Sequence, residues 1–218
     1  NFLTHKVAYN PHIHIAANFV AMVNALLADK EEIPYSKTLI PSEELTLAKA
    51  SVSEEDKETI RGIVRDCFIG FEPGRDKIIL INPNASELLI QRRWPPSHYV
   101  QLIKMILKAC PKALVLITGD PREREEAEHL KREVAHERCV NFAGKVSFAQ
   151  LPGLYSISEF MVTNDSGPGH FAAVTDMHTF VIFGPETPAL YGSLGKTTPI
   201  YAGLACSPCV SAANHRKT

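Results

Sequence analysis

From residue 77 onward, short runs of apolar and β-branched residues alternate with stretches whose apolar positions recur at helical spacing. The strand-like runs are residues 77–82, 113–118, 140–142, 160–163 and 179–183. The helix-like stretches are residues 97–109, 122–134, 147–156 and 167–174. Such alternation predicts βαβ units, and therefore an α/β domain in which a parallel sheet carries helices on both faces.

The first 72 residues lack this alternation and predict two helices instead. Apolar residues recur every three or four positions over residues 13–28. A second helix starts at Ser53, which forms a capping-box pattern with Asp56, and ends near Cys67. The polar segment 72–76 contains Pro and Gly, so we place a boundary there. Residues 1–72 are then connecting helices, and residues 73–218 form the α/β domain.

Three polar turns follow strands of the predicted sheet, at residues 82–86, 119–123 and 163–170. Ligands of parallel α/β sheets bind at the carboxyl ends of the strands, so we expect these turns to converge on one crevice. The third turn combines the helix-capping residues Asp165 and Ser166 with Gly167. A glycine lets a ligand approach the backbone, and free N–H groups at a helix start attract phosphate.

Four side chains near these turns have both a chemical and a structural interpretation. Ser86 and either Arg92 or Arg93 could face a diphosphate, because guanidinium groups match phosphate oxygens with paired donors. The same segment could instead be a solvated basic loop. Glu123 could accept hydrogen bonds from ribose hydroxyls, or it could belong to the acidic first turn of an exposed helix.

Two further side chains lie in the third turn. His170 could donate a hydrogen bond to an anion from either ring nitrogen, although an isolated histidine is often a packing residue. Asp165 is either an N-cap or a group that accepts hydrogen bonds from ligand hydroxyls.

The third turn also fits a different pattern. Gly167, Gly169 and Ala172 match the dinucleotide fingerprint G-x-G-x-x-A between a strand and a helix, and Glu186 follows nearly twenty residues later. An NAD-dependent oxidoreductase is therefore an alternative. Against it, the fingerprint belongs in the first βαβ unit, whereas this one follows four earlier strands.

Composition narrows the class of protein. The 218 residues carry 23 Lys and Arg against 24 Asp and Glu, and this formal net charge of −1 predicts no nucleic-acid partner. No apolar run approaches the roughly 20 residues that span a bilayer.

The five cysteines do not suggest a disulfide framework, so we expect a reducing compartment. Cys206 and Cys209 lack the second pair that a zinc site needs, and we predict no metal.

The domain resembles glycosyltransferase family 9, the ADP-heptose:lipopolysaccharide heptosyltransferases and their relatives. The resemblance rests on four blocks that fall in the family's order and spacing: Asn82-Pro83 with Arg92-Arg93-Trp94-Pro95; residues 141–145; residues 163–167 with 170–173; and residues 183–188. The family implies a GT-B fold, in which two Rossmann-like domains face each other across a cleft. By resemblance, this chain is the second of these domains, with connecting helices and a remnant of the first.

The resemblance also implies roles for individual residues in holding a nucleotide-diphosphate sugar. Ser86, Arg92, Gly167 and His170 would hold the diphosphate, together with Ser166 at the same helix start. Glu123 would meet the ribose, Val146 would lie beside the adenine through its backbone, and Asp165 would contact the donor sugar.

The expected function is inverting, metal-independent transfer from a nucleotide-diphosphate sugar, ADP-heptose or similar, to a lipopolysaccharide-type glycan or glycolipid. No cofactor is expected. The protein would be cytoplasmic, at the inner face of the membrane, with peripheral membrane association. The family's base lies in the amino-terminal domain, so we expect the present chain to bind nucleotide without turnover. The alternatives are the oxidoreductase and a non-catalytic sugar-nucleotide-binding module.

Overall fold

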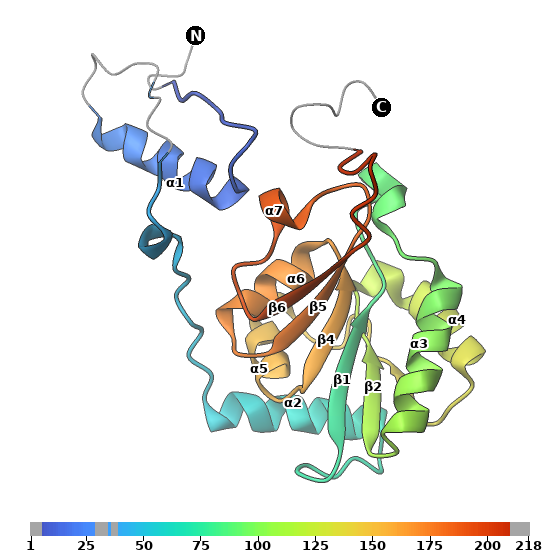
Figure 1. Ribbon diagram of the computed structural model, residues 1–218. Helices are drawn as coiled ribbons and strands as arrows, with labels where there is room; N and C mark the ends of the chain where they lie inside the picture. The colour runs from blue at the N-terminus through green and yellow to red at the C-terminus, as the bar shows by residue number, and fades with distance from the viewer. Residues whose placement is uncertain (1–5, 29–34, 36–38, 210–218) are drawn as a thin grey trace.

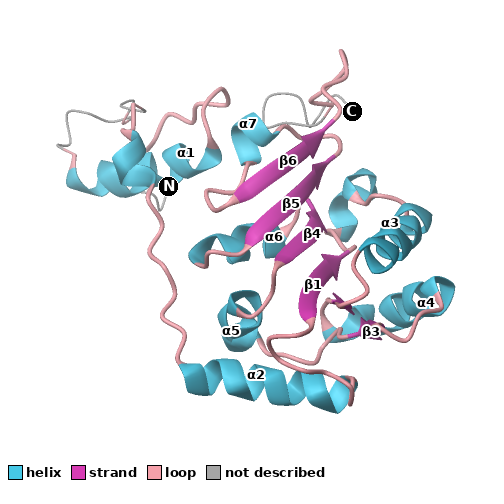
Figure 2. Cartoon of the chain, turned by 60° about the horizontal axis from the view of Figure 1, so that its bottom comes forward, coloured by secondary structure: helices cyan, strands magenta, loops and turns pink. Residues whose placement is uncertain are grey.

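The computed structural model describes residues 6–28, 35 and 39–209. Its centre is a six-stranded sheet in the order β3-β2-β1-β4-β5-β6, in which every neighbouring pair is parallel. The strands are β1 (Lys77–Asn82), β2 (Ala113–Ile117), β3 (Cys139–Asn141), β4 (Phe160–Asn164), β5 (His178–Phe183) and β6 (Thr197–Tyr201). Figure 2 shows them fanned into a twisted sheet. The predicted α/β class is confirmed.

Helices connect the strands and precede the sheet. The α-helices are α1 (Ile15–Asn24), α2 (Glu54–Cys67), α3 (Pro96–Ala109), α4 (Arg124–Val134), α5 (Leu151–Ser156), α6 (Gly167–Phe171) and α7 (Pro188–Tyr191). Short 3-10 turns cover Ala25–Leu27, Ser42–Leu45, Glu87–Arg92, Pro121–Glu123, Phe148–Gln150 and Ala172–Val174. The capping box predicted at Ser53 is present, because Ser53 Oγ accepts from Asp56 N at 3.0 Å and Asp56 accepts from Ser53 N at 3.0 Å.

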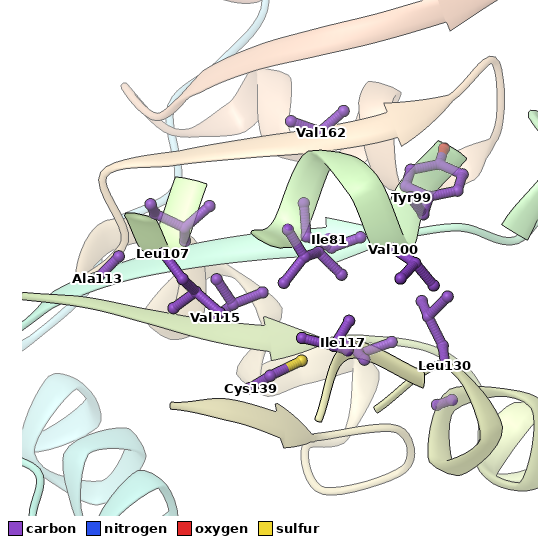
Figure 3. Packing of buried hydrophobic residues seen from close by; sticks show 14 of the residues in the cluster. Ile81, Tyr99, Val100, Leu107, Ala113, Val115, Ile117, Leu130, Cys139 and Val162 are labelled. Atoms are coloured by element: carbon purple, nitrogen blue, oxygen red, sulfur yellow. The ribbon is translucent and has the colours of Figure 1, made fainter. Parts of the chain in front are cut away.

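The two faces of the sheet bury separate cores, and alternate residues of each strand supply them. Ile79 and Ile81 of β1 face α3 and α4, in a cluster with Tyr99 and Ile103 of α3. Figure 3 shows residues of β1, β2, β3 and β4, among them Ile81, Ile117, Cys139 and Val162, gathered against α3 in this cluster. On the other face, Ile78 and Leu80 meet α2 and α5, in a cluster completed by residues such as Ile60, Val64 and Leu154. This double coverage explains why the strands are continuous apolar runs.

Helix α1 lies apart from the sheet beside α7, as Figures 1 and 2 both show. It packs in a small cluster with Ala21, Ala25 and Tyr35 at its centre. The ring of His14 contacts Gly192 O at 2.8 Å and links α1 to the segment after α7. Helix α2, by contrast, shares a core with β1. The boundary near residue 73 stays a prediction.

The structure differs from the predicted elements most clearly at β6 and α6, and the short helix α7 was not predicted either. Strand β6 was not predicted, because Pro199 interrupts an otherwise β-prone run; an edge strand tolerates proline. The helix predicted over 167–174 is α-helical only as far as Phe171 and ends as a 3-10 turn. No helix within the described ranges is both long enough and apolar enough to cross a membrane.

Candidate functional site

Strands β1 and β4 are neighbours in the sheet, and this is where the strand order reverses. The chain leaves β1 toward β2 on one side and leaves β4 toward β5 on the other. The connections diverge here, and such a switch point is the usual ligand site of open α/β sheets. A pocket of about 590 Å³ lies here, lined by residues from all three polar turns. The predicted convergence on one crevice is confirmed.

One half of this pocket is apolar. Its floor is formed by the buried Phe142, Leu154 and Tyr155. At its rim, Phe148 and Phe171 pack edge to face, with ring centroids 4.9 Å apart. Both rings expose a large fraction of their surface, 69% and 40%, so they can cover a planar apolar group in the pocket.

The other half is polar, and Glu123 is its best-defined carboxylate. Its Oε2 accepts a hydrogen bond from Asp120 N at 2.6 Å, which completes a capping box. Burial raises the pKa of Glu123, and the bond from Asp120 opposes that rise. Gly119 makes room for this arrangement, because a Cβ there would lie 2.8 Å from Glu123 Oε2 and 2.9 Å from Asn84 Nδ2. Glu123 thus has a structural role in the capping box, and its half-buried carboxylate also lines the pocket.

The basic residues that line the pocket are Arg122 and Arg93, and not Arg92. Arg93 is held by the turn after β1. Its Nη2 donates to Ala85 O at 2.9 Å, and its Nε donates to the same carbonyl oxygen at 3.2 Å. An ion pair with Glu126 is long, at 3.7 Å. Arg93 is thus oriented by the turn after β1, with its charge available to a ligand anion.

The start of α6 forms the third wall of the pocket. Its N-cap is Ser166, and none of the described side chains makes a cap hydrogen bond there. Ser166 Oγ instead donates to Asn164 O at 3.2 Å. The expectation that Asp165 caps this helix is wrong, since its side chain points to Arg92. Gly167 packs under Phe171, whose ring would lie 3.1 Å from a Cβ at this position.

Beside the pocket, Arg92 lies between two buried carboxylates. Its Nε is 3.6 Å from Asp165 Oδ2, and its Nη2 is 3.4 Å from Glu186 Oε1. Asp165 and Glu186 are only 4% and 5% exposed. Burial raises the pKa of both carboxyl groups, and the positive charge of Arg92 opposes that rise. We call these three residues the arginine cluster.

His170 projects from α6 beside the arginine cluster. Desolvation by the surrounding protein lowers the pKa of His170, although its side chain stays exposed; Asp165 opposes the shift, while His14 and Arg92 reinforce it. The lowered pKa favours the neutral imidazole of His170, which can donate one hydrogen bond to an anion.

Asn164, at the end of β4, joins β4 to the turn after β1. Its Oδ1 accepts hydrogen bonds from Trp94 N at 3.0 Å and from the Tyr99 hydroxyl at 2.9 Å. Its Nδ2 donates to Pro83 O at 2.7 Å. The residue is fully buried. This network holds the β1 turn against β4, and it therefore fixes the polar wall of the pocket.

The structure separates the eight predicted site residues into two groups. Five line the pocket: Ser86, Glu123, Val146, Ser166 and Gly167. The other three, Arg92, Asp165 and His170, lie together beside it.

Sequence reasoning missed the scaffold role of Asn164 and the two phenylalanines at the pocket rim, Phe148 and Phe171. It named Glu186 only as part of a dinucleotide pattern, and it left Arg93 as an alternative to Arg92. The one available signal was the position of these residues inside the four sequence blocks or next to them.

No group of three or more metal-ligating side chains exists among the residues that the structure describes. Cys206 is exposed and Cys209 is half-buried, and both are free thiols. Backbone contact anchors their segment, because Cys209 N donates to Pro185 O at 2.8 Å.

The sequence matches the model of glycosyltransferase family 9 (heptosyltransferase) over residues 4–218. The chain belongs to glycosyltransferase family 9. It is 28% identical over 183 residues to lipooligosaccharide heptosyltransferase 2 of Haemophilus influenzae, covering 77% of this chain and 51% of that relative.

Solved structures agree with this family assignment. The E. coli ADP-heptose LPS heptosyltransferase II matches with a TM-score of 0.65 and 26% identity, over 81% of this chain and 51% of that one. A family 9 glycosyltransferase of Veillonella parvula matches with a TM-score of 0.63 at 17% identity, over 82% of this chain and 47% of that one, which shows the shared fold. This family 9 chain thus spans about half the length of these relatives.

Family 9 membership supports the glycosyltransferase prediction and not the oxidoreductase alternative. The structure also gives two physical reasons against the dinucleotide pattern. The glycine pattern follows β4 rather than β1, and Glu186 is buried against Arg92 instead of being available to a ribose hydroxyl.

Proposed function

We propose that this family 9 chain binds the nucleotide-sugar donor of a heptosyltransferase-like enzyme, with ADP-heptose or a close analogue as donor. The observation that carries the proposal is the pocket at the β1–β4 switch point, whose apolar and polar halves suit a base and a phosphorylated sugar. Its volume, about 590 Å³, lies within the range of small-molecule sites. The relative with 26% identity is itself described as an ADP-heptose transferase.

In this proposal, the apolar half takes the base, with Val146 beside it, and Glu123 accepts hydrogen bonds from the ribose. The carboxylate is held ready for this by its bond from Asp120. Ser86 and the start of α6 at Ser166 and Gly167 hold the diphosphate, because uncapped helix N–H groups favour anions.

Asp165 meets the donor sugar, while Arg92 and His170 stabilise negative charge as the nucleoside diphosphate departs. We propose inverting transfer that needs neither a metal nor another cofactor. The acceptor is a lipopolysaccharide-type glycan, and the reaction takes place at the cytoplasmic face of the membrane. The base that activates the acceptor hydroxyl is proposed to lie outside residues 73–218.

Calorimetric titration of the folded chain with ADP, UDP and NADH tests the donor class. We expect ADP to bind, and to bind more tightly than NADH. A Glu123→Gln variant should lose about tenfold in ADP affinity, because a hydrogen bond to a charged acceptor is worth about 1.5 to 3 kcal/mol. The same variant should bind inorganic pyrophosphate as the parent does.

The matched control is Glu159→Gln, which makes the same chemical change just before β4, at the amino-terminal ends of the strands and opposite the pocket. Well-folded protein that binds no nucleoside diphosphate would refute the proposal. Tighter binding of NADH than of ADP would favour the oxidoreductase. A lack of transferase activity in longer protein, across donors and acceptors, would favour the non-catalytic module.

A further inference from the structure

Glu186 reaches the site through a close contact between two loops. Gly184, just after β5, lies so near the turn after β1 that a Cβ there would be 2.8 Å from Gln91 O. The next residue, Pro185, is anchored to the segment that contains Cys209, because its carbonyl oxygen accepts a hydrogen bond from Cys209 N at 2.8 Å. These contacts position the loop so that Glu186 Oε1 lies 3.4 Å from Arg92 Nη2.

The arginine cluster leaves polar atoms without hydrogen-bond partners. Arg92 Nε, Asp165 Oδ2 and Glu186 Oε2 are buried, and each lacks a hydrogen-bond partner among the described residues. The distance of 3.6 Å between Arg92 Nε and Asp165 Oδ2 gives electrostatic attraction without a hydrogen bond. Buried polar atoms are rarely left this way, so the observed contacts do not fully satisfy the cluster.

The charges in the cluster do not balance either. One guanidinium faces two carboxylates, and the other titratable neighbours are His170 of α6 and, beyond it, His14 before α1. Two buried anions that share one cation are costly. A diphosphate that approaches Arg92 therefore meets a cation that is already occupied by carboxylates.

We propose that Glu186 is a positioning residue that holds Arg92 beside the pocket and competes with the diphosphate of the bound nucleotide for its guanidinium. The proposal rests on the proposed function of the pocket. Arg93, and not Arg92, lines the pocket. Binding of a nucleoside diphosphate moves Arg92 from Glu186 to the phosphate, and return of Arg92 to Glu186 favours release of the product diphosphate.

Replacement by glutamine separates the charge of Glu186 from its shape. A Glu186→Gln side chain keeps an oxygen that can accept from Arg92 but no longer competes as an anion. We expect ADP to bind this variant about tenfold more tightly at about pH 8, the order expected for removing one charge near an anion. The gain should shrink toward acid, because protonation of Glu186 in the parent also removes its charge.

The experiment is calorimetric titration of parent and Glu186→Gln with ADP from about pH 5 to about pH 8, with Glu159→Gln as the control. Asp165 and His170 are present in both proteins, so the ratio of the two dissociation constants reports the removal of the Glu186 charge together with its coupling to Asp165. A merely structural role would not give a ratio that follows pH. A structure of the parent with ADP should show Arg92 bonded to phosphate and separated from Glu186.

Several outcomes would overturn the inference. These are a ratio of one at every pH, weaker ADP binding by the variant, and Arg92 still paired with both carboxylates when ADP is bound. A change seen with an ADP-sugar but not with ADP would place Glu186 on the sugar and would also overturn it. Failure of the parent to bind ADP is a separate result, which refutes the proposed function instead.

Discussion

Replacing Asn164 with alanine tests whether one buried amide holds the site together. The Asn164→Ala change removes the acceptor used by Trp94 N and by the Tyr99 hydroxyl, at 3.0 and 2.9 Å. It also removes the donor to Pro83 O, at 2.7 Å. The alanine methyl group satisfies none of these partners. Because Asn164 is fully buried, water has no direct path to replace the lost amide.

The size of the effect follows from these three contacts. A hydrogen bond between neutral groups contributes about 1 kcal/mol net, and a buried partner left unsatisfied costs about 1 to 3 kcal/mol. Asn164→Ala should therefore lower the free energy of unfolding by about 3 kcal/mol or more. Tyr99→Phe removes one partner and leaves Asn164 bonded to Trp94 and Pro83, so it should cost about 1 kcal/mol.

Urea unfolding followed by far-UV circular dichroism measures both variants, and the slope against urea should stay unchanged. Asn24→Ala is the control, because the side-chain hydrogen bond of Asn24 to Glu44 is long, at 3.4 Å, and exposed, so its loss should change stability by less than about 0.5 kcal/mol. ADP affinity should also fall in Asn164→Ala, because the turn after β1 is no longer fixed. If Asn164→Ala costs less than about 1 kcal/mol, the network does not hold the turn.

Further predictions concern the pocket, a helix cap and pH. Gly119→Ala places a methyl group 2.8 Å from Glu123 Oε2, so it should weaken ADP binding at least about tenfold while the protein stays folded by circular dichroism. Ser53→Ala should lower the free energy of unfolding by about 1 kcal/mol in urea titrations, through loss of a helix cap. Burial raises the pKa of Glu186 above 4.5, so its ionisation costs stability above that raised pKa. Glu186→Gln should therefore unfold at higher temperature than the parent at pH 7 in calorimetry, with the difference vanishing toward pH 4.5.

The architecture could be predicted from the sequence because the central strands β1, β2 and β4 are buried on both faces and form clear apolar runs. Strand β1 has the predicted bounds, and β3 differs from its prediction by one residue at each end. Strand β6 has one edge unpaired and only partial burial, so its residues include threonine and proline and give a weak signal. Whether a short run pairs at an edge depends on the neighbouring strand, which local sequence does not show.

The polar turns of the site were also predictable, since each directly follows a strand and parallel strands end at one edge. The different positions of the two arginines, with Arg93 in the pocket lining and Arg92 beside it, could not be predicted. They depend on Glu186, which lies 94 residues along the chain from Arg92 and reaches it only through the close approach at Gly184. Likewise, Asn164 shows no sign in the sequence that it will bridge to Trp94 and Tyr99.

The two ends of the sheet have a consequence for self-association. An exposed strand edge offers unpaired backbone groups to which another chain can add a strand, which is a common route to aggregation. Here β3, at one end, is only Cys139–Asn141, too short to template a long pairing. At the other end, β6 carries Pro199, which has no N–H to donate. Both edge strands are thus poor templates for pairing with a strand of another chain. The sheet is therefore protected against intermolecular β-pairing, although its strands are strongly apolar.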